Sequence, residues 1–197
     1  MKEATVVRMA AVAALAVAAY GCAEGPEPLG IQTDGLTPGS PAAAVNARRL
    51  DAPVWEAILS PVNPQVGPKA VTGKAVLTME DGLLTVRLDV RGVVAGQTHA
   101  QHIHGHAGES TCPTPQADSD GDGLVSVGEG APDYGPVMVP LTPFPAPEGS
   151  TYHYEQTFEN QGDLEPARRA IVVHGAFVDG TYEGSLPVAC GTIDRVR

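Results

Sequence analysis

Hydrophobic and polar residues alternate along much of the chain beyond residue 70. In residues 83–90 every second side chain is apolar, while the intervening positions are mostly polar or charged. Because successive side chains of a β-strand point to opposite faces, this pattern predicts a strand with one buried face. Residues 71–80 form a similar segment, and the Asp81-Gly82 pair between the two is a strong hairpin signal. The alternation therefore predicts a β-hairpin over residues 71–90.

Other short segments have the length and composition of strands. They are residues 54–59, 98–104, 136–141, 151–158, 170–178 and 186–193. The 23 glycines and 18 prolines among 197 residues favour short elements joined by tight turns. No segment has a sustained helical period, although residues 162–169 could form one helical turn. We therefore predict an all-β fold over residues 53–197, a Greek-key β-sandwich or barrel of seven or eight strands.

Residues 1–21 have the pattern of an export signal. Two basic residues precede an apolar run, residues 9–20, which is too short to cross the ~30 Å hydrocarbon core of a bilayer. The run leads into the sequence Ala-Tyr-Gly-Cys, residues 19–22, which resembles the lipobox of bacterial lipoproteins. This resemblance implies that Cys22 is lipidated and anchors the protein to a membrane, facing the periplasm or the cell exterior. Plain secretion is the alternative.

Composition adds three expectations. Residues 22–52 are rich in Pro, Gly and Ala without periodicity, so we expect a flexible tether. The 12 basic and 23 acidic residues give a formal net charge of −11, which argues against nucleic acid as a partner. If Cys22 carries a lipid, Cys112 and Cys190 remain in an oxidising compartment, either as a disulfide or as two free buried thiols.

Three histidines form a pattern suited to a metal ion. His102 and His104 flank Ile103 on a predicted strand, so both imidazoles project from the same face. His174 lies on another predicted strand and would supply a third nitrogen. Such a set suits copper or zinc, so we predict a metal site at these three residues. The alternative is that they are surface histidines beside glycine turns.

Two motifs resemble the copper/zinc superoxide dismutase family. The first is a His-x-His motif at residues 102–104, followed by a Cys at residue 112. The second is a Val-Val-His motif at residues 172–174, followed by Ala-Cys-Gly at residues 189–191. The resemblance implies a copper ion on His102, His104 and His174, a disulfide between Cys112 and Cys190, and superoxide as the substrate. Residues 71–104 and 134–139 also resemble the related chordin-type (CHRD) domain.

The chain departs from the dismutase pattern at three places. The family's bridging His after Cys112 and its zinc loop are missing, so we do not expect zinc. The Arg that lies shortly before the late Cys and steers superoxide in that family is missing as well, which argues against efficient dismutation. Two hypotheses follow: a copper-dependent superoxide dismutase, or a non-catalytic copper buffer or CHRD-like interaction module. No nucleophilic triad and no phosphate-binding glycine loop is recognisable, so hydrolases and kinases have no support.

Residues 118–129 match the pattern D-x-[DN]-x-[DN]-G-x₅-E of EF-hand calcium loops at every position. The ligands that this pattern assigns are Asp118, Asp120, Asp122, Leu124 through its carbonyl, Ser126 and Glu129. Prolines and glycines on both sides predict that neither flanking EF-hand helix forms. We therefore expect a structural Ca²⁺ site of weak affinity, ~10⁻⁴–10⁻³ M, that orders the connection beyond Cys112. The alternative is a solvated acidic turn.

Overall fold

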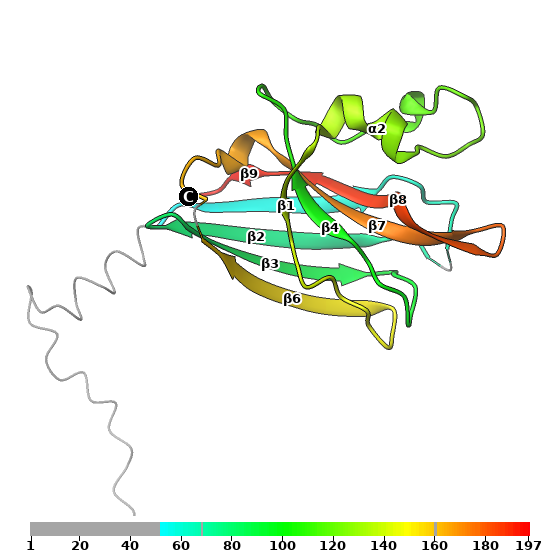
Figure 1. Cartoon of the computed structure of the whole chain (residues 1–197), viewed down its shortest axis with the longest axis horizontal. Helices are drawn as coiled ribbons and strands as arrows, with labels where there is room; N and C mark the ends of the chain where they lie inside the picture. The colour runs from blue at the N-terminus through cyan, green and yellow to red at the C-terminus, as the bar shows by residue number, and fades with distance from the viewer. Residues whose placement is uncertain (1–51, 68, 160) are drawn as a thin grey trace, which may run out of the picture.

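The computed structural model describes residues 52–67, 69–159 and 161–197 (Figure 1). The predicted export signal, the Cys22 lipidation site and all but the last residue of the predicted tether lie outside these ranges. None of the helices within the described ranges has the length and apolarity needed to cross a membrane.

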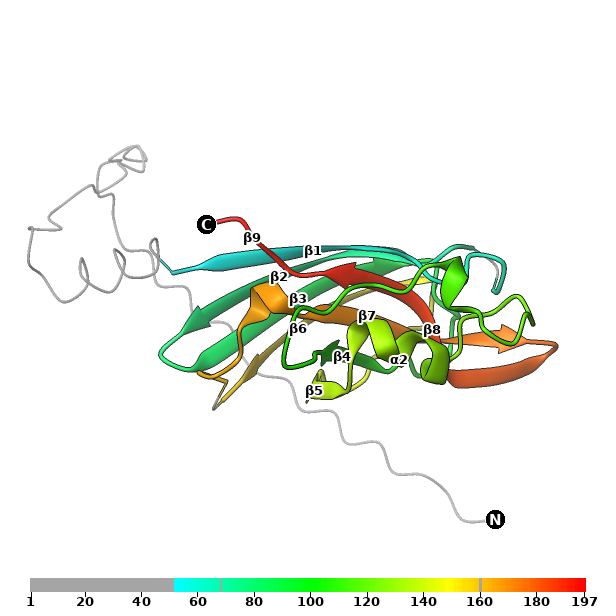
Figure 2. The ribbon, with the colours of Figure 1, turned by 90° about the horizontal axis from the view of Figure 1, so that it is seen from above.

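The described residues form an all-β fold, as predicted. The strands are β1 (Val54–Pro61), β2 (Thr72–Glu80), β3 (Leu83–Arg91), β4 (Gln101–His104), β5 (Val137–Pro140), β6 (Thr151–Phe158), β7 (Ala170–Val178), β8 (Thr181–Thr192) and β9 (Asp194–Arg195). They form one antiparallel sheet in the order β5-β4-β7-β8-β1-β2-β3-β6, and β9 pairs with β1. The sheet curls on itself (Figure 2). Three connections, β3 to β4, β5 to β6 and β6 to β7, cross between its two ends, as in a Greek key.

Two hairpins have the dipeptide Asp-Gly at their turns. At the predicted β2–β3 turn, Asp81 and Gly82 both have positive φ, 49° and 79°. Asp179 and Gly180 repeat this geometry between β7 and β8, with φ of 48° and 82°. Such a two-residue turn matches the twist of the paired strands. The strand expected over residues 186–193 is therefore longer at its start, because β8 begins at Thr181, directly after this second turn.

The main hydrophobic core lies on the inner face of the curled sheet. Leu84, Val86 and Leu88 of β3 are fully buried there, together with Ile103 of β4 and Ile171 of β7. Because neighbouring side chains on a strand alternate, an inward Ile103 sends the side chains on either side of it to the outer face. The fold therefore places the His-x-His motif outside the main core, on the face that the chain after β4 covers.

A second, smaller apolar cluster lies between this outer face and the segment that follows β4. It consists of Val62, Val125, Tyr134, Ala170, Val172 and Cys190. A disulfide joins Cys112 to Cys190, with the Cα atoms 5.6 Å apart, so the free-thiol alternative is excluded. The covalent bond and the apolar cluster together hold the segment from Cys112 to Tyr134 against β7 and β8.

The prediction that no helix flanks the acidic loop is wrong on its C-terminal side. Helix α2 (Val127–Tyr134) begins within the loop, because Ser126 and Glu129 form a capping box that satisfies its first amide groups. Pro132 lies inside the helix, so the carbonyl of Gly128 lacks its intrahelical amide partner. The other helical segments of the described residues are single 3₁₀ turns. They are η1 (Pro115–Ala117), before the acidic loop, and η2 (Pro166–Arg168), which lies within residues 162–169, where one helical turn is expected.

Candidate metal centre

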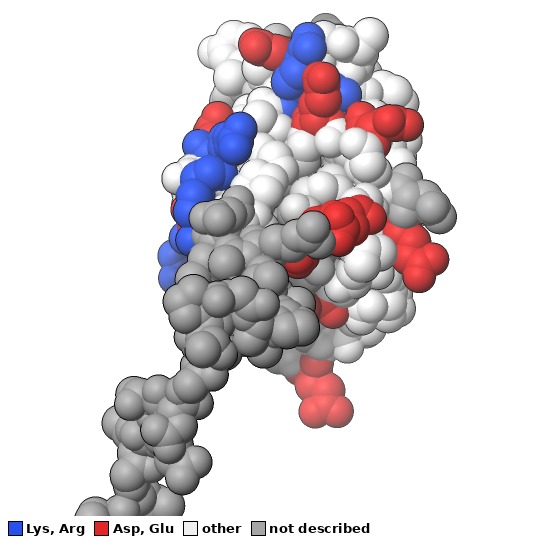
Figure 3. All heavy atoms as spheres, turned by 90° about the vertical axis from the view of Figure 1, so that its left-hand side faces the viewer, with Lys and Arg blue, Asp and Glu red and all other residues white. Residues whose placement is uncertain are grey.

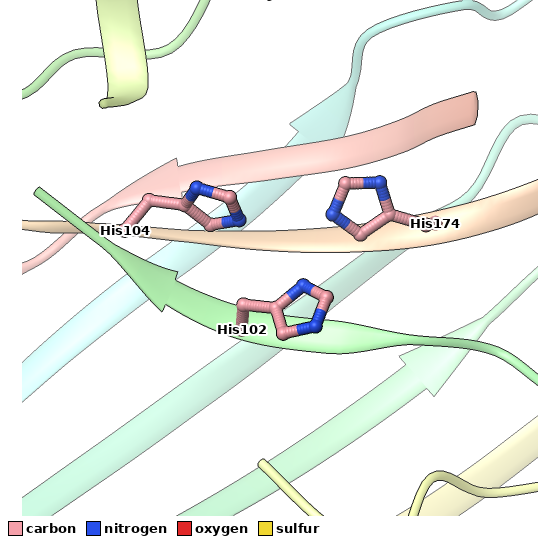
Figure 4. A group of neighbouring side chains, drawn as sticks. All are labelled: His102, His104 and His174. Atoms are coloured by element: carbon pink, nitrogen blue, oxygen red, sulfur yellow. The ribbon is translucent and has the colours of Figure 1, made fainter. Parts of the chain in front are cut away.

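The side chains of His102, His104 and His174 meet on the outer face of the sheet, where β4 pairs with β7 (Figure 4). Their ring centroids are 5.2–5.9 Å apart. One ring nitrogen from each lies within 4.8 Å of the other two. Nitrogens bound to one ion at ~2.0–2.1 Å lie at most ~4 Å apart, so the three atoms are at or near that separation. We refer to these residues as the three-His cluster.

Two main-chain carbonyls determine which nitrogens face the centre of the cluster. Nδ1 of His104 lies 2.8 Å from the carbonyl oxygen of Gly135, and Nδ1 of His174 lies 2.7 Å from that of Ser185. A carbonyl oxygen only accepts hydrogen bonds, so each Nδ1 carries the proton and donates it. In these neutral rings Nε2 is consequently the nitrogen with a free lone pair.

Three nitrogens of the cluster are buried without a hydrogen-bond partner among the described residues. They are Nδ1 of His102, Nε2 of His104 and Nε2 of His174. Figure 4 shows a nitrogen of each ring directed toward the space between the three side chains. Buried polar atoms are nearly always paired, so three unpaired ring nitrogens around one point need an explanation. A cation shared by the three lone pairs provides one.

Burial keeps these imidazoles in the form that binds metals. It lowers the pKa of His102 to about 4, with a smaller contribution from neighbouring His104. It also lowers the pKa of His174 to about 4, although the hydrogen bond to Ser185 opposes the shift. The pKa of His104 is lowered for the same reason, against the hydrogen bond to Gly135. All three rings are therefore neutral at pH 7, with lone pairs free to coordinate.

The lowered pKa values predict an acid-sensitive fold in the metal-free protein. Below pH 6.5 the unfolded chain takes up protons on these rings, whereas folded His102 and His174 stay neutral down to about pH 4. Since the unfolded state then binds more protons, the free energy of unfolding should fall as the pH falls. Between pH 6.5 and 5 we expect a loss on the order of 2 kcal/mol from His174 alone. Urea unfolding in the presence of chelator measures it, and a flat profile would contradict the expectation.

Aromatic rings pack against two of the three histidines. The Tyr134 ring lies 4.7 Å from the His104 ring, and the Phe144 ring lies 5.3 Å from the His102 ring. His104 and His174 are each 4% exposed, whereas His102 is only partly buried. His102 is therefore the most accessible of the three side chains.

The acidic loop, residues 118–129, brings only part of the predicted calcium ligands together. Carboxylate oxygens of Asp118, Asp120 and Glu129 lie within 4.8 Å of one another. Glu129 also accepts hydrogen bonds from the amides and hydroxyls of Ser119 and Ser126, which lower its pKa to about 2. These three carboxylates form an anionic, solvent-exposed group of hard oxygen donors.

The other predicted ligands make contacts within the loop itself. Asp122 accepts a hydrogen bond from the amide of Leu124, and the Ser126 hydroxyl caps α2 and donates to Glu129. Asp122 is not part of the three-carboxylate group. Three of the predicted calcium ligands, Asp118, Asp120 and Glu129, therefore lie together. Asp122 takes part in a local turn, and Ser126 caps the helix.

Sequence reasoning missed Asn63, which fastens the acidic loop to the sheet. This residue is 3% exposed. Its amide donates to the carbonyls of Val125 and Pro187, and its side-chain oxygen accepts from the amide of Val125. Asn63 thus pairs with Val125 as a neighbouring strand would, and Pro187 in turn pairs with His174. A lone asparagine in a Pro-rich turn gives no sequence signal for such a role.

Charged groups near the site have structural partners. Arg169 is 7% exposed, and its guanidinium donates to the carbonyls of His106 and Gly108. Arg168 pairs with Glu165 at 3.2 Å. At the end of the molecule shown in Figure 3, basic side chains gather along one edge and at the top, whereas acidic side chains are scattered over the rest of the face, so charge is not spread uniformly there. Arg168 and Nη1 of Arg169 are therefore engaged with the chain itself, whereas Nε of Arg169 is buried without a hydrogen-bond partner among the described residues.

Comparison of the chain with protein-family models and with curated proteins finds no match.

Proposed function

We propose that this protein binds a copper ion through His102, His104 and His174. The observation that supports this most strongly is the convergence of three buried ring nitrogens that have no partner among the described residues. The rings are neutral, and hydrogen bonds to Gly135 and Ser185 fix two of them with Nε2 free. Imidazole nitrogens are ligands for copper and zinc. The residues present therefore fit a metal of this class.

Copper is favoured over zinc by affinity and by the resemblance in the two histidine motifs. Nitrogen sites generally bind Cu²⁺ more tightly than Zn²⁺. Among the described residues, the group that could share an ion here contains histidines alone, without a carboxylate or thiolate. The resemblance to copper/zinc superoxide dismutases in the two histidine motifs points the same way. A bound copper ion would supply one-electron redox chemistry toward a small anion such as superoxide.

The protein's own residues would contribute orientation and access. The carbonyls of Gly135 and Ser185 hold two rings, and the aromatic rings of Tyr134 and Phe144 pack against His104 and His102. Arg169 donates from Nη1 to main-chain carbonyls, which hold its guanidinium in place without neutralising its charge. This arrangement supports copper binding more strongly than rapid dismutation, and a copper buffer or CHRD-like module is the second candidate.

A superoxide-removal assay separates the two candidates. The full chain is loaded with one equivalent of Cu²⁺, freed of unbound metal and compared with the same concentration of free copper. A dismutase should exceed free copper, and a His174→Ala variant loaded in the same way should lose that excess. A rate no higher than that of free copper would reject the enzyme and leave the buffer or module.

We further propose that the acidic loop binds Ca²⁺ and stiffens the segment that covers the three-His cluster. The full motif match and the convergence of Asp118, Asp120 and Glu129 support this. One helix, α2, does follow the loop, but η1 before it is a single turn, so no helix pair is available to open. A structural role therefore fits better than a calcium-sensing switch.

Calcium should stabilise the wild-type fold measurably. At about 10 mM Ca²⁺ and an affinity of ~10⁻⁴–10⁻³ M, linkage gives about 1.4–2.7 kcal/mol, or several degrees in Tm. Asp120→Ala should remove this increment and leave Tm in chelator nearly unchanged, because Asp120 is exposed. Differential scanning calorimetry with and without Ca²⁺ measures both. Equal Tm values for the wild type in the two conditions would refute the calcium site.

The Cys112–Cys190 disulfide favours an exported protein, because such bonds persist in oxidising compartments. Together with the lipobox-like sequence at residues 19–22, it supports the proposal that a lipid on Cys22 holds the protein on a membrane surface. Mass spectrometry of the protein purified from its native membrane would detect the acyl chains on Cys22.

A further inference from the structure

We infer that Gly135 is a positioning residue of the three-His cluster: its carbonyl, at the C-terminal end of α2, selects the ring nitrogen that His104 offers to the metal. This inference rests on the proposed copper site, because it concerns how one ligand of that site is prepared. The evidence comes from a hydrogen bond, a backbone conformation and a close main-chain contact.

The hydrogen bond fixes the tautomer of His104 before any metal arrives. Its Nδ1 donates to the Gly135 carbonyl over 2.8 Å, and the residue is 4% exposed, so water does not compete readily. The proton is therefore held on Nδ1, and Nε2 is left buried without a partner. If this carbonyl moved away, Nδ1 would lose its acceptor and the ring could place its proton on Nε2 instead. That tautomer has no lone pair directed at the cluster.

Only glycine gives the carbonyl this position. Gly135 has φ of +86°, a conformation that side chains disfavour. A Cβ atom there would lie 2.6 Å from the carbonyl carbon of Gly105 and 2.7 Å from its oxygen. Gly105 directly follows His104, and a Cβ atom at Gly105 would in turn clash with the side chains of Arg169 and Met138. The main chain at the end of α2 thus packs directly on the main chain that carries the ligand.

The position of the carbonyl at a helix end adds an electrostatic effect. Gly135 is the C-cap of α2, so its carbonyl lies next to the negative end of the helix. A partial negative charge on the Nδ1 side of His104 makes Nε2 a stronger donor, as partners of metal-bound histidines do generally. A stronger donor favours the more highly charged ion, so the contact should stabilise Cu²⁺ more than Cu⁺. His174 differs, because its carbonyl partner, Ser185, lies within strand β8.

The test compares full-length wild type, Gly135→Ala and Gly180→Ala. Gly180 is a matched control, since its φ is +82° but a Cβ there would meet nothing within 4 Å. In the metal-free proteins, ¹⁵N NMR of the imidazoles reports the tautomer of His104. We expect the Nδ1–H form in wild type and Gly180→Ala, and a shift toward Nε2–H in Gly135→Ala.

Competition titrations with Cu²⁺ and with Cu⁺ give the second readout. Gly135→Ala should lose ~10–100-fold in Cu²⁺ affinity, the usual cost of losing such a partner, and less in Cu⁺ affinity. Gly180→Ala should match wild type. Equal losses for both ions, or none, would overturn the inference, because a purely structural defect does not discriminate between oxidation states.

The two readouts separate the failure of this inference from the failure of the proposed function. Wild type that shows the Nδ1–H tautomer but binds no copper would refute the copper site and leave the role of Gly135 in fixing the tautomer standing. Wild type with His104 in the Nε2–H form would overturn the inference directly, even if Gly135→Ala does not fold.

Discussion

Replacing His174 with alanine should weaken Cu²⁺ binding on the order of 100-fold or more. Partners that only orient a ligand already contribute about 10–100-fold to metal affinity, and His174 would supply one of three bonds. The remaining pair, His102 and His104, lies on one four-residue strand and offers two nitrogens in place of an enclosed set of three. His174 is also the ligand on β7, so its loss disconnects the ion from that strand.

His153→Ala is the matched control for this prediction. The His153 side chain on β6 is 58% exposed and pairs with Asp89 on the neighbouring strand β3. These two strands lie at the opposite end of the sheet from β4. Its removal should leave copper affinity unchanged in a competition titration. Equal affinities for wild type and His174→Ala would mean that copper binds elsewhere, and the three-His site would then be rejected.

Removing the disulfide is the second change with a large expected effect. The Cys112→Ser, Cys190→Ser double variant releases a cross-link between residues 78 apart in sequence, for which chain entropy gives on the order of 4 kcal/mol of stability. Cys190 is buried against Val125 and Tyr134 in the smaller apolar cluster, so its replacement by serine also places a polar group there. Urea unfolding at neutral pH measures the loss.

The same double variant should also bind copper more weakly than wild type. The disulfide fixes one end of the segment that delivers the Gly135 carbonyl to His104. With that end free, the segment samples more conformations, and the ring is held less firmly. Unfolding and copper titrations at a temperature where both proteins are folded distinguish this effect from global instability. An unchanged free energy of unfolding would contradict the stabilising role of the bond.

Alternation marks β3 in the sequence because every second side chain of this half-buried strand is buried, whereas other strands could be predicted from their length and composition. Residues 151–158 and 170–178 were predicted with their observed bounds, and the inward Ile103 correctly placed His102 and His104 on one face. Errors arose where local signals compete. Proline and glycine near residue 130 argued against a helix, yet the capping box at Ser126 is strong enough to start one.

The contacts that prepare the site could not be predicted, because they join backbone atoms distant in sequence. Any residue has a carbonyl, so nothing in the sequence marks the ones at positions 135 and 185 as partners of histidines. The pairing of Asn63 with Val125 spans 62 positions and depends on the curl of the sheet. What the sequence does provide is the set of ligand types; their protonation and orientation follow only from the three-dimensional arrangement.

Copper stoichiometry and coordination, measured on the full chain, test the central claim most directly. After loading with Cu²⁺ and removal of weakly bound metal, elemental analysis should find one copper per chain, and electron paramagnetic resonance should show splitting from several imidazole nitrogens. A protein that retains no copper, or whose bound copper shows only oxygen ligands, would contradict the proposal that the buried nitrogens of His102, His104 and His174 share one ion.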